Sequence, residues 1–189
     1  MKLKIADLRL YIGYEVVAAM AAVLLLDREN RVICCFAAAL LHELGHLLMM
    51  RLFSVRVRGL KLRLFDVLIE ADEPASFCAD ICITLGGVLM NFLCAVLLCP
   101  FSLKLGLPHV MLGIFNLLPV MSLDGGRLLY LLVTRRFSPR AGDVILKLST
   151  FLFLLPLMTA GLYLLFQSGY NYSLLVISLY LTAILFFKH

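Results

Sequence analysis

Long runs of apolar residues with few charges constrain this chain more than any other feature of its sequence. The run over residues 77–98 contains Asp80 as its one charged residue, and about 20 apolar residues suffice for a helix to cross a bilayer. Hydrophobic residues make up 63% of the 189 positions, and charged residues only 15%. A soluble core of this size cannot bury that much apolar surface. The sequence therefore predicts an all-α polytopic membrane protein.

Six apolar segments predict a bundle of six transmembrane helices. They cover residues 11–26, 32–50, 77–98, 109–120, 146–166 and 172–187. The fourth segment is too short to span alone, so we expect a broken element that continues into residues 127–133. The first is expected to be a retained helix, because Asp27 and Arg28 follow it without a cleavage pattern. Six crossings place 14 of the 17 Lys and Arg on one side, which predicts cytoplasmic termini in a bacterial cell membrane.

The segment 52–70 differs from its surroundings because its side chains alternate. Val55-Arg56-Val57-Arg58 and the run from Leu60 to Leu64 have a period of two, which is typical of a strand. The alternation changes phase at Gly59, as a bulge or tight turn would cause. The sequence therefore predicts a small β element between the second and third helices.

Charge and cysteine content exclude two other classes of protein. The basic residues gather in a few short polar segments, and the chain has no Trp. This pattern does not predict a nucleic-acid partner. Six cysteines fall mostly within apolar runs, and none forms a Cys-x-x-Cys pair. We therefore predict neither a cysteine zinc knuckle nor a disulfide framework.

The second apolar segment contains His42-Glu43-Leu44-Gly45-His46, an H-E-x-x-H motif. Histidines four residues apart project from one face of a helix and can share a metal ion, and Glu43 is close enough to reach a water on that metal. About 0.002 such matches are expected by chance from this composition. Polar groups inside an apolar helix are costly unless they serve a site. The alternative is a hydrogen-bonded polar patch between helices.

A catalytic zinc takes three protein ligands, so the motif needs a third. Asp124 is the candidate, within Asn116-Leu-Leu-Pro-Val-Met-Ser-Leu-Asp124-Gly125. Pro119 is expected to break the fourth helix, and Gly125 allows a close turn beside another backbone. The alternative is that Asp124 caps the next helix. His109, at the far end of the fourth segment, is expected at the surface.

These motifs resemble those of the site-2 protease family of intramembrane zinc metalloproteases. The likeness rests on H-E-L-G-H at 42–46, on N-x-x-P-x-x-x-L-D-G at 116–125, and on Gly87-x-x-x-Asn91. It covers about residues 32–127, although Val88 stands where many members have proline. It implies one peptidase domain over 1–189, with a core at 32–127 and accessory helices at 11–26, 146–166 and 172–187.

The resemblance also implies roles for individual residues. Zn²⁺ would be held by His42, His46 and Asp124, and Glu43 would accept a proton from the attacking water. Asn91 and Asn116 would orient substrate or stabilise the oxyanion. Gly87, Pro119 and Gly125 would shape the backbone around the site. The strand segment 55–64 would receive the substrate as an added strand.

Within the family, the expected six helices resemble the branch of the stage IV sporulation factor, whose C-terminal regulatory domain this chain would lack. The expected substrate is then a membrane-associated pro-protein, such as a sporulation sigma-factor precursor. A membrane regulatory partner or homo-oligomer is a further expectation. Two alternatives remain: a non-catalytic metal-binding protein, either a transporter or an inactive relative, and a membrane peptidase of another family. Glu43 argues against the first, and the distant Asp124 against the second.

Overall fold

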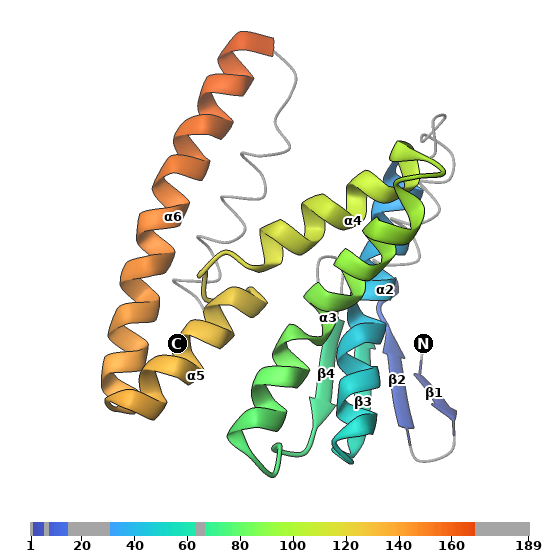
Figure 1. The fold of residues 1–189 in the computed structure, drawn as a ribbon, viewed down its shortest axis with the longest axis vertical. Coiled ribbons are helices and arrows are strands. Elements are labelled where there is room, and N and C mark those ends of the chain that lie inside the picture. The colour runs from blue at the N-terminus through green and yellow to red at the C-terminus, as the bar shows by residue number, and fades with distance from the viewer. Residues whose placement is uncertain (1, 6–7, 15–30, 63–66, 169–189) are drawn as a thin grey trace. The chain divides into compact units, whose positions relative to one another are not determined.

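The structure is a computed structural model that describes residues 2–5, 8–14, 31–62 and 67–168 (Figure 1). The chain divides into two compact units, Met1–Ile114 and Phe115–His189. The expected helices at 11–26 and 172–187 lie outside the described residues, apart from Tyr11 to Tyr14. Each unit is held together by its own contacts.

Helices α2 (Arg31–Leu52) and α3 (Phe77–Leu98) form the centre of the first unit. They approach most closely where Gly45 lies against Gly86. A Cβ atom added to Gly86 would lie 2.7 Å from the carbonyl oxygen of Gly45, and one added to Gly45 would meet the carbonyl oxygen of Gly86. Two glycines are therefore required here, because only they let the two backbones come this close. This contact fixes which faces of α2 and α3 meet.

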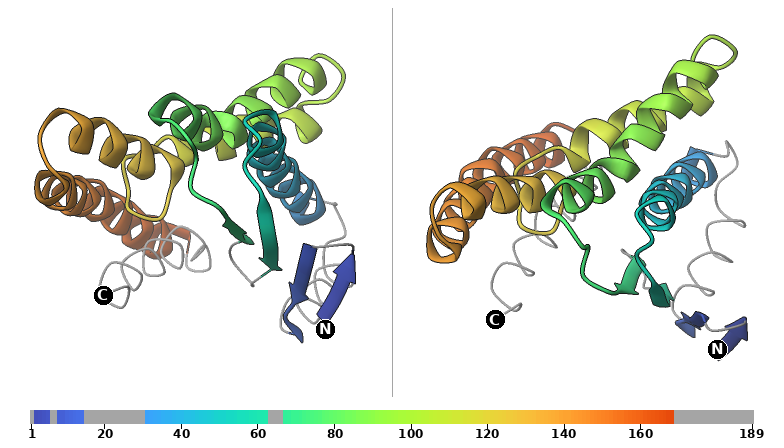
Figure 2. Two further views of the ribbon diagram at one scale, coloured as in Figure 1. Left: turned by 90° about the horizontal axis from the view of Figure 1, so that it is seen from below. Right: turned by 60° about the horizontal axis from the view of Figure 1, so that its bottom comes forward.

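Four strands form a sheet in the same unit, in the order β1-β2-β3-β4. They are β1 (Lys2–Ile5), β2 (Leu8–Ile12), β3 (Val57–Leu62) and β4 (Val67–Ala71). Figure 2 shows these strands apart from the helices α2 and α3. The register of β3 and β4 shifts between Val57 and Gly59. The predicted β element between the second and third helices, with its irregularity at Gly59, is therefore confirmed.

The two N-terminal strands were not predicted. Strand β2 pairs with β3 in parallel, with Arg9 opposite Gly59 and Ile12 opposite Leu62. Residues 11 and 12, which we expected to begin a transmembrane helix, belong to this strand. The sequence did carry a weak signal, since basic and apolar residues alternate from Lys2 to Ile5 and again from Leu8 to Leu10. The pairing itself joins segments about 50 residues apart, which no local pattern encodes.

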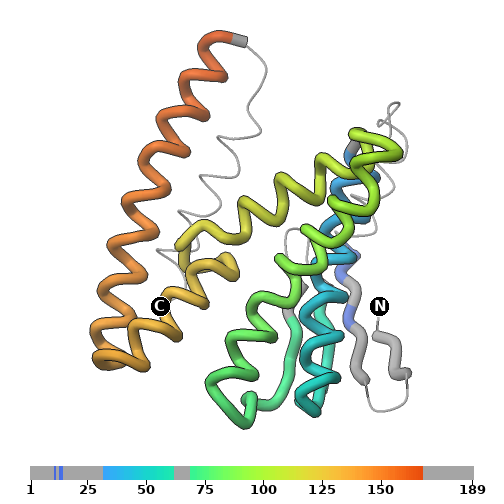
Figure 3. The backbone as a smooth tube through the Cα atoms, viewed as in Figure 1, coloured from blue at the N-terminus to red at the C-terminus, as the bar shows by residue number. Residues whose placement is uncertain are grey.

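The expected broken fourth element is present as two helices. Helix α4 (Leu103–Asn116) and helix α5 (Asp124–Arg136) are separated by a short loop that contains Pro119. Helix α6 (Pro139–Ser168) follows α5 after a short connection, which Figure 3 traces. Within the second unit, Val120 and Leu154 are buried against Phe115, Leu118, Leu123 and Phe153. This cluster packs the loop before Asp124 onto α6.

A bundle of six transmembrane helices is not supported. The described residues contain five helices, from α2 to α6. Three segments are long and apolar enough to cross a membrane: Val32–Leu52, Phe77–Leu98 and Pro139–Gln167. Large apolar side chains on α3 stay exposed, and Val96 is 72% accessible. A lipid environment accommodates such surfaces, whereas water does not, so these helices support an integral membrane protein.

Candidate metal centre

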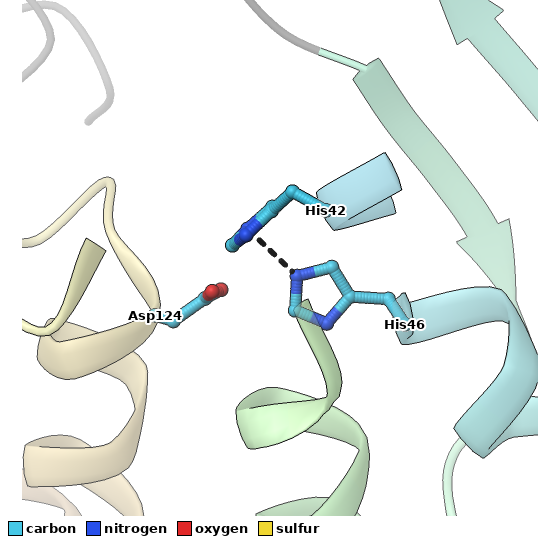
Figure 4. Close-up of side chains that lie close together, drawn as sticks. All are labelled: His42, His46 and Asp124. Atoms are coloured by element: carbon cyan, nitrogen blue, oxygen red, sulfur yellow. Dashed lines mark hydrogen bonds between the residues drawn. The ribbon is translucent and has the colours of Figure 1, made fainter. Parts of the chain in front are cut away.

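His42 and His46 bring two metal-binding nitrogen atoms together on one face of α2. They lie one helical turn apart, and their Nε2 atoms are 3.1 Å from each other (Figure 4). The ring centroids are 4.8 Å apart and the ring planes meet at 85°. Both side chains are buried. The H-E-x-x-H motif therefore places two buried imidazoles next to each other on one face of an apolar helix.

The backbone of α3 determines which nitrogen of His46 carries its proton. His46 Nδ1 lies 2.7 Å from the carbonyl oxygen of Ile83. A carbonyl oxygen only accepts hydrogen bonds, so the proton resides on Nδ1 and the lone pair on Nε2. An imidazole that donates from one nitrogen to a carbonyl and offers the other to a metal is the usual arrangement in metal sites.

Gly87 of α3 faces both Nε2 atoms. A Cβ atom at this position would lie 2.5 Å from His46 Nε2 and 2.6 Å from His42 Nε2. Any other residue would place a Cβ atom against both imidazole rings. The first glycine of the Gly87-x-x-x-Asn91 motif thus leaves room for a ligand of the histidines.

Asn91 lies one turn further along α3 and is fully buried. Its Nδ2 donates to His42 Nδ1 at 3.1 Å, and its Oδ1 accepts from His109 Nδ1 at 3.0 Å. In this structure the amide of Asn91 thus bonds two imidazoles and is buried, and its role on the substrate stays a prediction. His109 is only 3% exposed, so the expectation of a surface histidine was wrong.

Glu43 follows His42 on α2 and is half-buried. No cysteine joins the pair of imidazoles, and the six cysteines form no disulfide. Among the described residues of α2, the two imidazole nitrogens are thus accompanied by the Glu43 carboxylate, one residue after His42.

Asp124 belongs to the second unit, where it is the first residue of α5, and Figure 4 also draws its side chain. The cap position of this helix is Leu123, so the alternative that Asp124 caps α5 is not borne out. A Cβ on Gly125 would meet the carbonyl oxygen of Leu117, which shows that the preceding loop folds tightly over the start of α5. Asn116 ends α4 and is half-buried.

Two hydroxyl groups of α6, which the sequence did not single out, hold this loop. Thr150 is fully buried, and its Oγ1 accepts from the backbone N–H of Met121 at 2.9 Å. Ser149 Oγ donates to the carbonyl oxygen of Pro119 at 2.8 Å. These bonds satisfy backbone groups that the break at Pro119 would otherwise leave without partners. They fix the backbone three residues before Asp124.

The pair of histidines fits a zinc ion. Two nitrogen ligands at about 2.0–2.1 Å from a tetrahedral zinc are about 3.3 Å apart. The observed separation of 3.1 Å is therefore a few tenths of an ångström short of this value. Imidazole together with carboxylate is the ligand set of catalytic zinc sites, which keep one position open for water.

Comparisons with known proteins agree with this chemistry. The sequence profile of Peptidase family M50 matches residues 101–157. A zinc metalloprotease of Methanocaldococcus jannaschii is 26% identical over 119 residues, which cover 56% of this chain and 35% of that protein. The chain therefore spans about a third of the length of this curated relative.

The fold agrees as well. A solved structure, the site-2 protease from Methanocaldococcus jannaschii, matches with a TM-score of 0.70 at 21% identity, covering 96% of this chain and 91% of the other. The chain thus has the fold of this site-2 protease. The chain is therefore similar to a zinc metalloprotease and, over residues 101–157, to Peptidase family M50.

Proposed function

We propose that this protein is an intramembrane zinc endopeptidase that hydrolyses a peptide bond of a membrane-associated protein. The observation that carries the proposal is the pair of Nε2 atoms on the apolar helix α2. They are 3.1 Å apart and lie next to Gly87 of α3. Such a buried polar pair is costly in a bilayer unless it serves a site. Similarity to proteases of Peptidase family M50 supports the same conclusion.

Zinc is held in this proposal by His42, His46 and Asp124. Among the described residues, these three supply the ligand types of a catalytic zinc site, each with one ligand atom. Pro119 and Gly125 give the loop before α5 its tight path, and Ser149 and Thr150 secure it. The core over residues 32–127 and the accessory helices act as one peptidase domain.

Glu43 is the general base. When bound, zinc would act as a Lewis acid that activates water for attack on a peptide carbonyl. The Glu43 carboxylate accepts the proton of that water and later delivers it to the leaving amine. Asn116, half-buried at the end of α4, is the amide that orients the substrate carbonyl. Asn91, predicted for the same task, also donates to His42.

The substrate pairs with an edge strand of the sheet. Strand β3 lies between β2 and β4, so both of its edges are already hydrogen-bonded. The expectation that residues 55–64 receive the substrate is therefore wrong for β3. Among the strands of the described residues, β4 ends the strand order and has one edge that an added strand could pair with. A substrate that pairs with this edge would be held as an extended strand, in which its peptide bond is accessible to hydrolysis.

The finer features of the function follow from the sequence. The excess of Lys and Arg on one side favours cytoplasmic termini in a bacterial membrane. A sporulation sigma-factor precursor is the substrate that the resemblance favours, and a membrane regulatory partner or a second copy of the chain would control its entry.

The test compares zinc content and peptide cleavage in purified protein. The wild type in detergent or nanodiscs should hold one zinc ion per chain and cleave a membrane-anchored pro-protein. Glu43→Gln should retain the zinc and lose at least about 100-fold in cleavage rate, because a general base contributes about 10²–10⁴-fold. Cleavage that survives Glu43→Gln would contradict this mechanism.

The competing function is metal binding without hydrolysis. Its supporting observation is the same imidazole pair, which would serve a transporter equally well. Zinc that moves across vesicles containing the Glu43→Gln variant at the wild-type rate would favour it over the protease.

A further inference from the structure

A continuous chain of hydrogen bonds runs through the first unit behind the metal-binding pair. It begins at His109 on α4, passes through Asn91 on α3 and reaches His42 on α2. From His42 it continues to His46 and ends at the carbonyl oxygen of Ile83. Asn91 is fully buried and His109 nearly so. The proposed chemistry uses the two ligands but gives no role to His109.

All bonds of this chain point in one direction. Asn91 Nδ2 only donates, so His42 Nδ1 accepts and the proton of His42 is on Nε2. His42 Nε2 then donates to His46 Nε2, and His46 Nδ1 donates to Ile83. At the other end, Asn91 Oδ1 only accepts, so His109 Nδ1 carries a proton. These directions form one self-consistent arrangement of the hydrogen bonds.

A metal bound to His42 requires the hydrogen bonds from His42 through Asn91 to His109 to run in the reverse direction. Metal binding at Nε2 needs the lone pair there, so the proton of His42 must be on Nδ1. Nδ1–H then needs an acceptor, which Asn91 provides if its amide turns over and presents Oδ1. The amide nitrogen then faces His109 and donates to Nδ1, so the proton of His109 must move to Nε2.

Histidine is suited to this exchange in a way that other side chains are not. A neutral imidazole changes from donor to acceptor at Nδ1 by moving one proton within the ring, without a change of charge. Lysine and arginine only donate, and an ionised carboxylate only accepts. Because the surroundings are buried, a partner fixed in one role would leave a polar atom of Asn91 unsatisfied in one of the two states.

We propose that His109 is a positioning residue that acts through Asn91 to hold His42 in the tautomer that binds metal. This inference rests on the proposed function, because it requires the metal at His42 and His46. Removal of an outer partner of a metal-binding histidine typically lowers metal affinity by about 10–100-fold. His109 would set the affinity of the site without touching the metal or the substrate.

The first test measures zinc affinity by competition with a chromophoric chelator in detergent-solubilised protein. His109→Leu removes the partner of Asn91 and should weaken zinc binding by about 10–100-fold. His109→Asn carries an amide that either donates or accepts near the position of Nδ1, and should restore affinity to within about threefold of wild type. Met111→Ala, an exposed substitution on the same helix, is the control and should bind zinc as the wild type does.

The second test follows the wild-type protein, and a variant serves only to assign the signal. Nitrogen-15 spectra of the wild-type imidazoles report which ring nitrogen carries the proton. Zinc loading should move the proton of His109 from Nδ1 to Nε2, and the signal is assigned by its absence in His109→Asn. A purely structural histidine would keep its tautomer.

The outcomes separate this inference from the proposed function. Tight zinc binding by the wild type with no effect of His109→Leu, or with an unchanged tautomer of His109, overturns the inference and leaves the protease intact. Equal weakening by His109→Leu and His109→Asn also overturns it, since packing alone would then explain the loss. A wild type that binds no zinc overturns both. Weakening by leucine, rescue by asparagine and a tautomer change together support it.

Discussion

Replacing Gly87 by alanine should remove the metal from this protein while leaving its helices in place. The added Cβ would lie 2.5 Å from His46 Nε2 and 2.6 Å from His42 Nε2. It would press against both imidazole rings at the nitrogen atoms that we assign as ligands. Alanine forms helices better than glycine by about 0.5–1 kcal/mol, so α3 itself should not be weakened.

The size of the effect follows from the distances. Ordinary contact of a Cβ atom begins at 3.4 Å, so each ring would have to retreat by about 0.9 Å in a close-packed interior. Metal–ligand distances in good sites hold to about ±0.2 Å. The two imidazoles therefore could not bind one ion together. Since loss of an outer partner already costs about 10–100-fold, displacement of the ligands should lower zinc affinity by at least about 100-fold.

The assay is zinc binding by chelator competition, with the unfolding temperature measured alongside. Gly113→Ala is the matched control, because it is the same change in a buried helical position of the same unit. Its Cβ would lie 3.1 Å from the ring of Phe92, which a small movement of the ring relieves. Its zinc affinity should stay within about threefold of wild type. If Gly87→Ala binds zinc as tightly as the wild type, the metal is not between these nitrogen atoms.

Two further predictions concern stability. Thr150→Val leaves the N–H of Met121 without its hydroxyl acceptor, so the free energy of unfolding should fall by about 1–3 kcal/mol in denaturant titrations. Thr159→Val on the same helix is the control, because this hydroxyl is exposed and bonds only within its own turn; a change there within about 0.5 kcal/mol is expected, and equal losses would contradict the role of Thr150. Arg58→Ala removes an ion pair with Asp72 whose side chains are 71% and 38% exposed, and should change stability by less than about 1 kcal/mol in the same assay; a larger loss would mean that the pair holds the hairpin.

Local patterns in the sequence were sufficient for the parts of the fold that depend on neighbours along the chain. The apolar run at residues 77–98 has the bounds of α3, and the phase change at Gly59 marks the irregular register of β3. The spacing of His42 and His46 is enough to predict their shared face, because helix geometry alone determines it.

The missed features depend on contacts between distant segments. His109 is buried because Asn91 of another helix bonds it, and nothing in the residues around His109 indicates this partner. Thr150 donates to the carbonyl oxygen of Leu146 within its own helix, and Ser149 shares its one proton between the carbonyl oxygens of Leu146 and Pro119. Bonds to the preceding turn are common for hydroxyls in helices. Their second role, on the loop before Asp124, becomes apparent only in the folded second unit.

The central claim is that zinc is bound by two histidines and a carboxylate, and X-ray absorption at the zinc edge of the purified wild-type protein tests it most directly. We predict nitrogen and oxygen ligands at about 2.0–2.2 Å, with the outer-shell scattering of two imidazoles. Sulfur ligands at about 2.3 Å, or a spectrum without imidazole scattering, would contradict the account.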